Sequence, residues 1–281
     1  MIDIIKFLVL GIIQGITEVF PVSSSGHLAI FVLLSNELHI GSPIDIDNIE
    51  IFLMITNFGS LIAMIIFFWN DLISLLKSAI SFIFKHKESK ENTVIMDDMR
   101  YILKLLIAVI PLGIAGLIFA DYLDKFSSLL FVGISLLITG IMLYTVYHLR
   151  NKNYTNEITY KRSFIISIFQ MFAIFPGISR SGITMIGGLS QKIELKKVLK
   201  FSFLAYIAIS IPVSVKGILD ALDVSESINV IGYFMAFLTS FIFTFLTVKV
   251  LYKYVKVNNL VYFAIYCILI GLLSIILYQV F

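Results

Sequence analysis

Long apolar runs constrain the fold of this chain more than any other feature of its sequence. They lie near residues 48–69, 98–120, 126–149, 198–219, 229–252 and 259–280. Each has about the 20 apolar residues that a helix needs to cross a bilayer. Charged residues are only 14% of the 281 residues, against 59% hydrophobic residues, whereas soluble domains have about a quarter charged residues. The sequence therefore predicts an all-α integral membrane protein and excludes a soluble domain.

Charge and cysteine content narrow the class further. The net charge is +3, and the basic residues gather between apolar runs, where they orient a membrane protein. We therefore expect membrane lipid around the chain and no nucleic-acid partner. The single cysteine, Cys267, lies inside an apolar run, so we expect it to be buried and to form neither a disulfide nor a metal-thiolate site. No small-residue cleavage pattern follows the first apolar piece, so we expect it to be retained.

Two segments break the pattern of long runs. Residues 1–36 and 163–189 each consist of two short apolar pieces on either side of a proline. Neither piece reaches the length of a span, so each segment is predicted to form a re-entrant helical hairpin. Irregular backbone at membrane depth is tolerated only where protein buries it or a wet cavity adjoins it. A third segment, residues 71–92, begins with an amphipathic stretch and is predicted to form an interfacial helix and a loop.

The chain repeats one order of elements, approximately over residues 1–150 and 155–281. Phe20-Pro21 followed by Ser23-Ser24-Ser25-Gly26 lines up with Phe175-Pro176 followed by Ser179-Arg180-Ser181-Gly182. Two short Ser/Gly loops can be similar by chance, but the matching order of apolar runs around them favours a repeat. One hairpin and three transmembrane helices cross the membrane an odd number of times. The halves are therefore predicted to be inverted repeats within a single membrane domain.

The charges of the connections predict the orientation. Connections assigned to the cytoplasm carry Lys77, Lys85, Lys87, Lys90, Arg150, Lys152, Lys161, Arg162, Lys192, Lys196, Lys197, Lys253 and Lys256. Those assigned to the outside carry Glu37, Asp45, Asp47, Asp121, Asp124, Lys125, Asp220, Asp223 and Glu226. This asymmetry follows the positive-inside rule. We therefore expect the N-terminus outside, the first hairpin entering from outside, the second from the cytoplasm, and the two tips meeting near mid-membrane.

The first hairpin concentrates polar side chains that are costly inside a membrane and therefore indicate function. Gln14 and Glu18 are four residues apart, on one face of a helix. Three consecutive hydroxyls, Ser23, Ser24 and Ser25, are N-cap candidates for the next helix. The first turn of that helix would hold His27. Free amides and hydroxyls at a helix start favour anion binding.

The second hairpin contributes a cation. Arg180 lies between Ser179 and Ser181 at another predicted helix start, with Thr184 one turn further on. The planar guanidinium group suits bidentate recognition of phosphate. A carboxylate, an imidazole, hydroxyls and an arginine at two opposed helix starts together predict phosphoryl chemistry.

The two motifs resemble the signature pair of the bacterial undecaprenyl-diphosphate phosphatases, the bacitracin-resistance family. The resemblance is carried by Gln14-x-x-x-Glu18, Pro21-Val-Ser-Ser-Ser-Gly-His27 and Pro176-Gly-Ile-Ser-Arg-Ser-Gly-Ile-Thr184, with lesser landmarks at Asn57-Phe-Gly-Ser-Leu-Ile-Ala63, Phe68-Trp69, Ile110-Pro111, Phe201-Ser-Phe-Leu204 and Phe263-Ala-Ile-Tyr266. It implies a multi-pass enzyme of the bacterial inner membrane that removes the terminal phosphate of undecaprenyl diphosphate. It also implies recycling of the carrier for cell-wall glycans, bacitracin resistance, a divalent cation such as Mg²⁺ or Ca²⁺, an active site reached from outside, and a possible homodimer.

The resemblance and the chemistry suggest roles with alternatives. Glu18 is expected to be a metal ligand or general acid/base, the alternative being a structural charge satisfied by Gln14 or a backbone amide. His27 is expected to be the nucleophile or the base that activates Ser24, the alternatives being a helix cap and attack by metal-activated water. Arg180 is expected to clamp the diphosphate, the alternative being an arginine that reaches to the interface. Second-tier contacts with the substrate are expected from Gln14, Ser23, Ser25, Ser179, Ser181 and Thr184.

Some positions depart from the family pattern. Gln14 leaves Glu18 as the sole carboxylate of its motif, Asn57 stands where His or Gln is usual, and Cys267 stands where a basic residue is frequent. A competing hypothesis is an inverted-repeat transporter or flippase for a phosphorylated lipid, and a non-catalytic scaffold is a third. Release of phosphate from a diphosphate lipid would distinguish the enzyme. The groove for the lipid tail is not predicted, because apolar helix faces occur throughout the chain.

Overall fold

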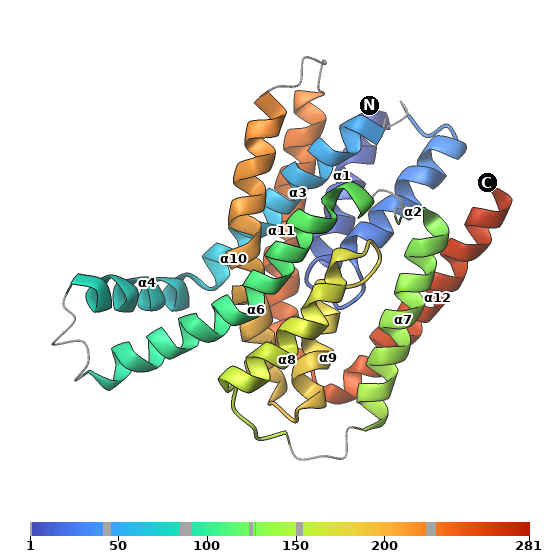
Figure 1. Ribbon diagram of the computed structural model, residues 1–281. Coiled ribbons are helices and arrows are strands. Elements are labelled where there is room, and N and C mark those ends of the chain that lie inside the picture. Colours follow the sequence, from blue (N-terminus) through green and yellow to red (C-terminus); the bar gives the residue numbers. More distant parts are fainter. Residues whose placement is uncertain are drawn as a thin grey trace.

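The computed structural model describes residues 2–41, 46–84, 92–123, 126, 128–149, 154–222 and 229–281. Apart from an isolated bridge between Asn156 and Ile193, the regular structure of these residues is helical. Figure 1 shows the helices packed side by side, with α4 and the start of α6 projecting as an arm. The predicted all-α class is confirmed.

Most of the predicted spans are single long helices. The described residues contain five helices long and apolar enough to cross a membrane, and a sixth when α3 is taken together with α4. The chain is therefore a multi-pass membrane protein. The long helices are α3 (Ile46–Phe67), α6 (Thr93–Leu123), α7 (Leu129–His148), α10 (Leu195–Leu222), α11 (Val230–Tyr254) and α12 (Leu260–Val280).

Helix α4 (Trp69–Phe84) lies where an interfacial helix was predicted, in the first part of residues 71–92, and the loop predicted after it falls mostly on residues 85–91, outside the described residues. It is bent by 77° from α3, and its outer end exposes Ile83 and Phe84. Two contacts fix its polar face: Lys200 Nζ donates to Asp71 Oδ1 at 2.5 Å, and Ser78 Oγ donates to Asp98 Oδ2 at 2.7 Å. A helix so turned and so amphipathic suits a membrane surface, and that location stays a prediction.

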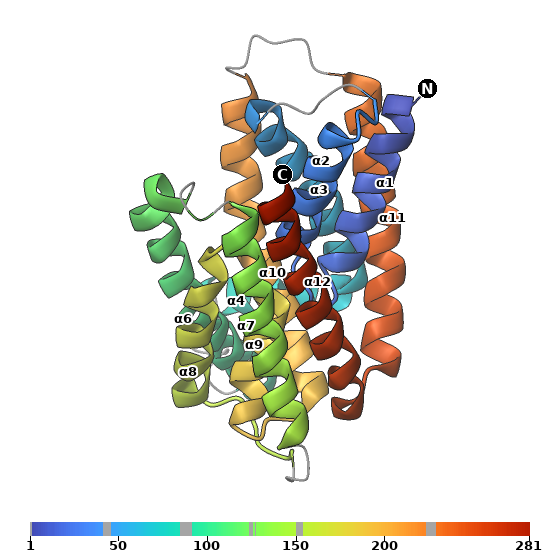
Figure 2. The same ribbon diagram turned by 90° about the vertical axis from the view of Figure 1, so that its right-hand side faces the viewer.

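Both segments form helical hairpins, whereas their re-entry into a membrane stays a prediction. The first consists of α1 (Ile2–Thr17) and α2 (Ser24–Glu37), and the second of α8 (Tyr160–Met171), the 3-10 turn η2 (Phe172–Ile174) and α9 (Arg180–Ser190). The helices of both are shorter than the ~20 residues of a span. In Figures 1 and 2 the two hairpins enter the bundle from opposite ends and turn inside it.

The tips of the two hairpins touch, as predicted. Ser181 Oγ donates to the carbonyl oxygen of Phe20 at 3.2 Å, and the amide of Gly177 donates to Ser25 Oγ at 3.3 Å. These bonds satisfy polar groups of irregular backbone that lipid could not satisfy. Residues more than 150 positions apart in the sequence are thereby brought to one place.

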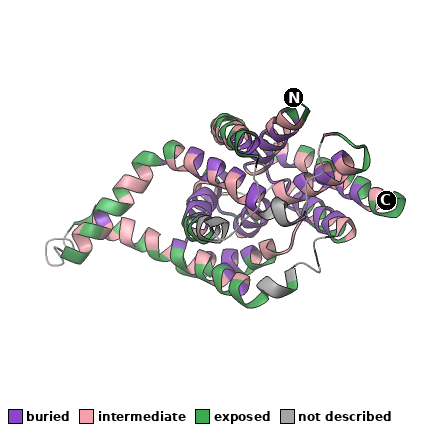
Figure 3. Ribbon diagram, turned by 90° about the horizontal axis from the view of Figure 1, so that it is seen from above, coloured by how far each residue is buried: buried purple, intermediate pink, exposed green. Residues whose placement is uncertain are grey.

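Close packing brings α11 against α1 of the first hairpin and against α3. A Cβ atom on Gly15 of α1 would lie 2.7 Å from the Ser240 carbonyl oxygen of α11, and one on Gly59 of α3 would lie 2.6 Å from the Phe237 carbonyl oxygen. Small residues that allow such approach are a main source of helix association in membranes. Figure 3 shows the buried residues on the inward faces of the bundle.

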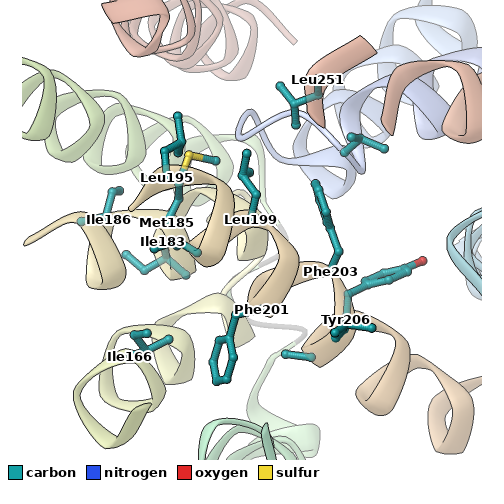
Figure 4. Packing of buried hydrophobic residues seen from close by; sticks show 14 of the residues in the cluster. Ile166, Ile183, Met185, Ile186, Leu195, Leu199, Phe201, Phe203, Tyr206 and Leu251 are labelled. Carbon is teal, nitrogen blue, oxygen red and sulfur yellow. The ribbon is translucent and has the colours of Figure 1, made fainter. Parts of the chain in front are cut away.

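The largest core cluster positions α9. Ile183, Met185 and Ile186 of α9 pack with Leu199 and Phe201 of α10, all of them buried (Figure 4). The helix that begins with Arg180 is therefore held rigidly, which fixes the second tip relative to the first.

Candidate active site

The turn of the first hairpin follows from its sequence. Helix α1 ends at Thr17, and Pro21, which lacks an amide hydrogen, lies in the turn that follows. Ser23 has a φ of 70° and is the N-cap of α2, where its Oγ accepts a hydrogen bond from the amide of Gly26 at 3.3 Å. The predicted serine cap is thus confirmed at Ser23. Ser24 and Ser25 occupy the first turn of the helix.

A short polar network lies beside this turn. Ser24 Oγ donates to Glu18 Oε2 at 2.6 Å, and Gln14 Nε2 donates to the same oxygen at 2.9 Å. Gln14 Nε2 also donates to Asn57 Oδ1 of α3 at 2.7 Å. One oxygen of the carboxylate therefore accepts from both Gln14 and Ser24, and a carboxylate bonded to a hydroxyl in this way could act as its base.

The second tip is built on the same plan. Ser179 caps α9, with its Oγ accepting from the amide of Gly182 at 3.1 Å. Gly177 has a φ of 89°, and a Cβ atom there would lie 2.7 Å from the Val132 carbonyl oxygen. Only glycine fits this position without strain, because the backbone is left-handed and another chain segment lies against it.

Arg180 is the cationic side chain among the residues of the two tips that line the cavity. Its Cζ atom lies 5.0 Å from the centre of the Tyr206 ring of α10, in a cation–π contact. Its Nη1 is buried and donates no hydrogen bond to any described residue. A buried guanidinium donor with no partner is costly, and an anion in front of it would satisfy it.

The two tips enclose one polar cavity of about 130 Å³. It is lined by Gln14, Thr17, Glu18, Ser23, Ser24, Ser25, Leu53, Asn57, Ala173, Ile178, Ser179, Arg180 and Ser181. Pockets for drug-sized ligands measure about 300–1,000 Å³, so this cavity suits a headgroup and leaves a lipid tail outside. Eight of the ten predicted site residues line it.

His27 and Thr184 do not line the cavity. The ring nitrogens of His27 already have partners, with Nδ1 2.7 Å from the Ser23 carbonyl oxygen and Nε2 2.8 Å from the Tyr266 hydroxyl. The His27 ring also stacks on that of Tyr266. Thr184 is buried, and its hydroxyl donates to the Arg180 carbonyl oxygen at 2.8 Å. The chemical roles of both stay predictions.

Sequence reasoning missed several residues of the site. Thr17, Leu53, Ala173 and Ile178 line the cavity without a recognisable chemical pattern. Tyr206 could have been suspected only from its place near the Phe201 landmark. Cys267 is fully buried, as predicted, and its thiol lies 3.6 Å from the Pro21 carbonyl oxygen.

The donor set fits a hard divalent cation. Among the described residues there is no group of three or more His, Cys, Asp or Glu side chains that could hold a metal ion alone. However, Gln14 Oε1 is buried without a hydrogen-bond partner beside Glu18 and the serine hydroxyls. Mg²⁺ binds through one or two carboxylates together with neutral oxygens and substrate phosphates. The residues present therefore match a cation shared with a phosphorylated substrate.

The fold and the cavity define an integral membrane protein with a polar cavity that contains a carboxylate, hydroxyls and an arginine. Comparison with known proteins is more specific. The chain belongs to the family described as bacitracin resistance protein BacA, whose model matches residues 7–273.

Named relatives cover almost the whole chain. It is 49% identical to an undecaprenyl-diphosphatase of Acholeplasma laidlawii, over 99% of this chain and 98% of that protein. It is 37% identical to undecaprenyl-diphosphatase 2 of Bacillus thuringiensis, over 97% of each chain. An undecaprenyl-diphosphatase of Oceanobacillus iheyensis is 36% identical, over 97% of this chain and 96% of that protein.

Proposed function

We propose that this protein hydrolyses undecaprenyl diphosphate to undecaprenyl phosphate and inorganic phosphate. The reaction recycles the lipid carrier of cell-wall synthesis and, by lowering the amount of free diphosphate lipid, gives resistance to bacitracin. Relatives that bear this activity in their names align over almost the whole chain. The observation that carries the proposal is the contact of Ser24 with Glu18 opposite the unpartnered Nη1 of Arg180, within one cavity.

Arg180 binds the diphosphate. Its buried Nη1 lacks an acceptor, and phosphate oxygens are the acceptors that a guanidinium group matches best. The capped starts of α2 and α9 add backbone amides and partial positive charge at the same cavity. Negative charge that moves onto the bridging oxygen is therefore stabilised as the terminal phosphoryl group leaves.

Ser24 is the nucleophile that the hydrogen bonds favour over His27. Glu18 takes the Ser24 Oγ proton, Oγ bonds to the terminal phosphorus, and the bond from that phosphorus to the bridging oxygen breaks. Glu18 then returns the proton as undecaprenyl phosphate leaves. Water cleaves the Ser24 phosphoester with Glu18 again as base, which releases inorganic phosphate and restores the hydroxyl.

A divalent cation, Mg²⁺ or Ca²⁺, is the cofactor we propose. Glu18 and the oxygen of Gln14 would hold it, and phosphate oxygens of the substrate would complete its shell. Such an ion neutralises phosphate charge. Gln14 and Asn57 keep the Glu18 carboxylate oriented toward the cavity.

The two halves are proposed to be inverted repeats that face opposite sides of the membrane. Entry of the hairpins from opposite ends of the bundle (Figure 1) supports this arrangement, as does the charge of the connections. The cavity would then open to the periplasmic or extracellular side. A homodimer remains a further prediction from the family resemblance.

Release of phosphate from undecaprenyl diphosphate by the purified protein, with and without a chelator, tests the proposal. We expect turnover that stops with the chelator and returns with Mg²⁺ or Ca²⁺. Substrate labelled at the terminal phosphorus, quenched in acid, should leave label on Ser24. Absence of phosphate release would overturn the function, and full activity of Ser24→Ala would overturn the nucleophile. Transport of an intact diphosphate lipid without hydrolysis would favour the flippase.

A further inference from the structure

Two apolar hollows flank the tip of the second hairpin. One, the α7 hollow, has a volume of about 400 Å³ and lies between α7 and the second hairpin. Its α7 side is formed by Ile134, Ile138 and Met142. The other, the α6 hollow, has a volume of about 510 Å³ and lies between α6 and the second hairpin, with Ala115 and Phe119 on its α6 side. Both volumes fall in the range of about 300–1,000 Å³ that is typical of ligand sites.

The hollows adjoin each other. Phe126, Phe172 and Phe175 line both of them. The Phe126 ring stands between the two, with its centre 5.1 Å from that of Phe131 and 5.2 Å from that of Phe175. We refer to the pair of hollows as the apolar groove.

The apolar groove also adjoins the polar cavity. Ile178 lines both the α7 hollow and the cavity that contains Arg180 and Ser24. A molecule with a charged head in the cavity therefore has the α7 hollow beside it, across Ile178, and the α6 hollow next to that. No charged side chain lines the apolar groove among the described residues, so its lining suits hydrocarbon.

We propose that the apolar groove binds the polyisoprenoid tail of the substrate, a step that rests on the proposed function. The isoprene units nearest the diphosphate lie in the α7 hollow, and later units lie in the α6 hollow. Ile138 and Phe172 are partly exposed, 43% and 53%, so the tail can leave the groove sideways into lipid. A tail far longer than the groove is thereby accommodated.

The apolar groove is proposed to position the diphosphate relative to Ser24 rather than to add binding energy. Lipid is as apolar as the groove, so moving the tail between them yields little hydrophobic free energy. Holding the first units of the tail instead fixes the direction from which the diphosphate reaches Ser24. A larger side chain that fills part of the groove should therefore reduce kcat/KM for a substrate with a long tail. It should leave kcat/KM unchanged for a substrate whose tail is too short to reach that side chain.

A pair of substitutions one helical turn apart tests the groove. Ile138 lines the α7 hollow, whereas Ile141 on the same helix does not and is 58% exposed. We expect Ile138→Trp to lower kcat/KM for undecaprenyl diphosphate about tenfold, which is a change of about 1.4 kcal/mol. The turnover of inorganic pyrophosphate or methyl diphosphate, which lack a tail, should stay within about twofold of wild type. Ile141→Trp should leave both substrates unchanged.

The second hollow gives an independent variant. Ile168 of α8 lines the α6 hollow, whereas the exposed Phe164, one turn before it, does not. We expect Ile168→Trp to impair undecaprenyl diphosphate while sparing farnesyl diphosphate, because the short tail ends in the α7 hollow. Phe164→Trp is its control.

The outcomes separate this inference from the proposed function. Equal kcat/KM of the groove variants and their controls on undecaprenyl diphosphate would overturn the inference, and so would an equal loss on the tail-less substrates. Failure of the wild-type protein to hydrolyse any diphosphate would overturn the proposed function. Elution of each variant as a single species in size-exclusion chromatography in detergent identifies the folded variants to be compared.

Discussion

The tips of the two hairpins share one serine-capping pattern and differ in charge. Each has a serine N-cap that accepts from a glycine amide three residues on, Ser23 in the first and Ser179 in the second. In each the cap hydroxyl lies 3.3 Å from the hydroxyl two residues later. Between those hydroxyls the first tip has Ser24 and the second has Arg180.

The exchange of Ser24 for Arg180 distinguishes the chemical roles that we propose for the two tips. Ser24 points its hydroxyl at a carboxylate of its own hairpin, whereas the second hairpin supplies no carboxylate to the cavity. Arg180 instead rests on Tyr206 with a free donor. In the mechanism proposed above, a repeated cap thus carries the acid/base groups at one tip and the anion clamp at the other, and both tips line the same cavity.

The largest expected effect comes from the carboxylate. Glu18→Gln leaves an acceptor for Gln14 but removes the base for Ser24, so we expect phosphate release to fall about 10²–10⁴-fold. The measurement is initial rate with purified protein, and Glu37→Gln, which changes an exposed carboxylate at the end of α2, should be near wild type. A normal rate in folded Glu18→Gln would remove the acid/base role from the first tip.

The matching change at the second tip is Arg180→Lys. It keeps the charge but loses the planar fork, so we expect kcat/KM to fall about 10²-fold. Arg100→Lys, at an exposed arginine, is the control and should have no effect. If Arg180→Lys retains wild-type kcat/KM, the clamp is a point charge and the division between the tips is less sharp.

A smaller effect is expected from the support of the carboxylate. Asn57→Ala removes one of the two acceptors of the Gln14 amide, and loss of such a bond amounts to about 1 kcal/mol. We expect roughly a fivefold loss of kcat, corresponding to that energy. Thr56→Ala is the neighbouring control, because that hydroxyl bonds only within its own helix. Equal rates for both variants would contradict a role for Gln14 in orienting Glu18.

The smallest expected effect concerns the bond between the tips. Ser181→Ala removes the donor to the Phe20 carbonyl oxygen, which should lower the free energy of unfolding by about 1 kcal/mol. The thermal unfolding midpoint in detergent is the measurement. Ser190→Ala, whose hydroxyl bonds within α9, should leave the midpoint higher than Ser181→Ala does. The reverse order would mean that the tips are held by packing alone.

The sequence predicted the parts whose cause is local. Short apolar pieces around Pro21 and Pro176 predicted the hairpins, and the run Ser23-Ser24-Ser25 predicted the serine cap of the first. The meeting of the tips followed from the topology. Eight of the predicted site residues line the cavity, because six lie at the starts of α2 and α9 and the other two, Gln14 and Glu18, lie at the end of α1.

Features that depend on distant partners were not predictable. The orientation of the His27 ring is set by Tyr266, which is 239 positions away in the sequence. The ring beneath Arg180 belongs to Tyr206 on another helix. The apolar groove combines faces of α6, α7 and the second hairpin, and each face alone resembles any lipid-facing surface.

The hydrogen bonds between the two tips bear on the order of events during synthesis. Ser25 meets Gly177, and Phe20 meets Ser181, across separations of 152 and 161 positions. When only the first half of the chain has been synthesised, the polar turn of the first hairpin lacks the second hairpin that it contacts in the folded protein. The nascent chain must keep that turn hydrated or shielded until the second hairpin arrives. The cavity, which both tips line, is therefore complete only when both hairpins are in place.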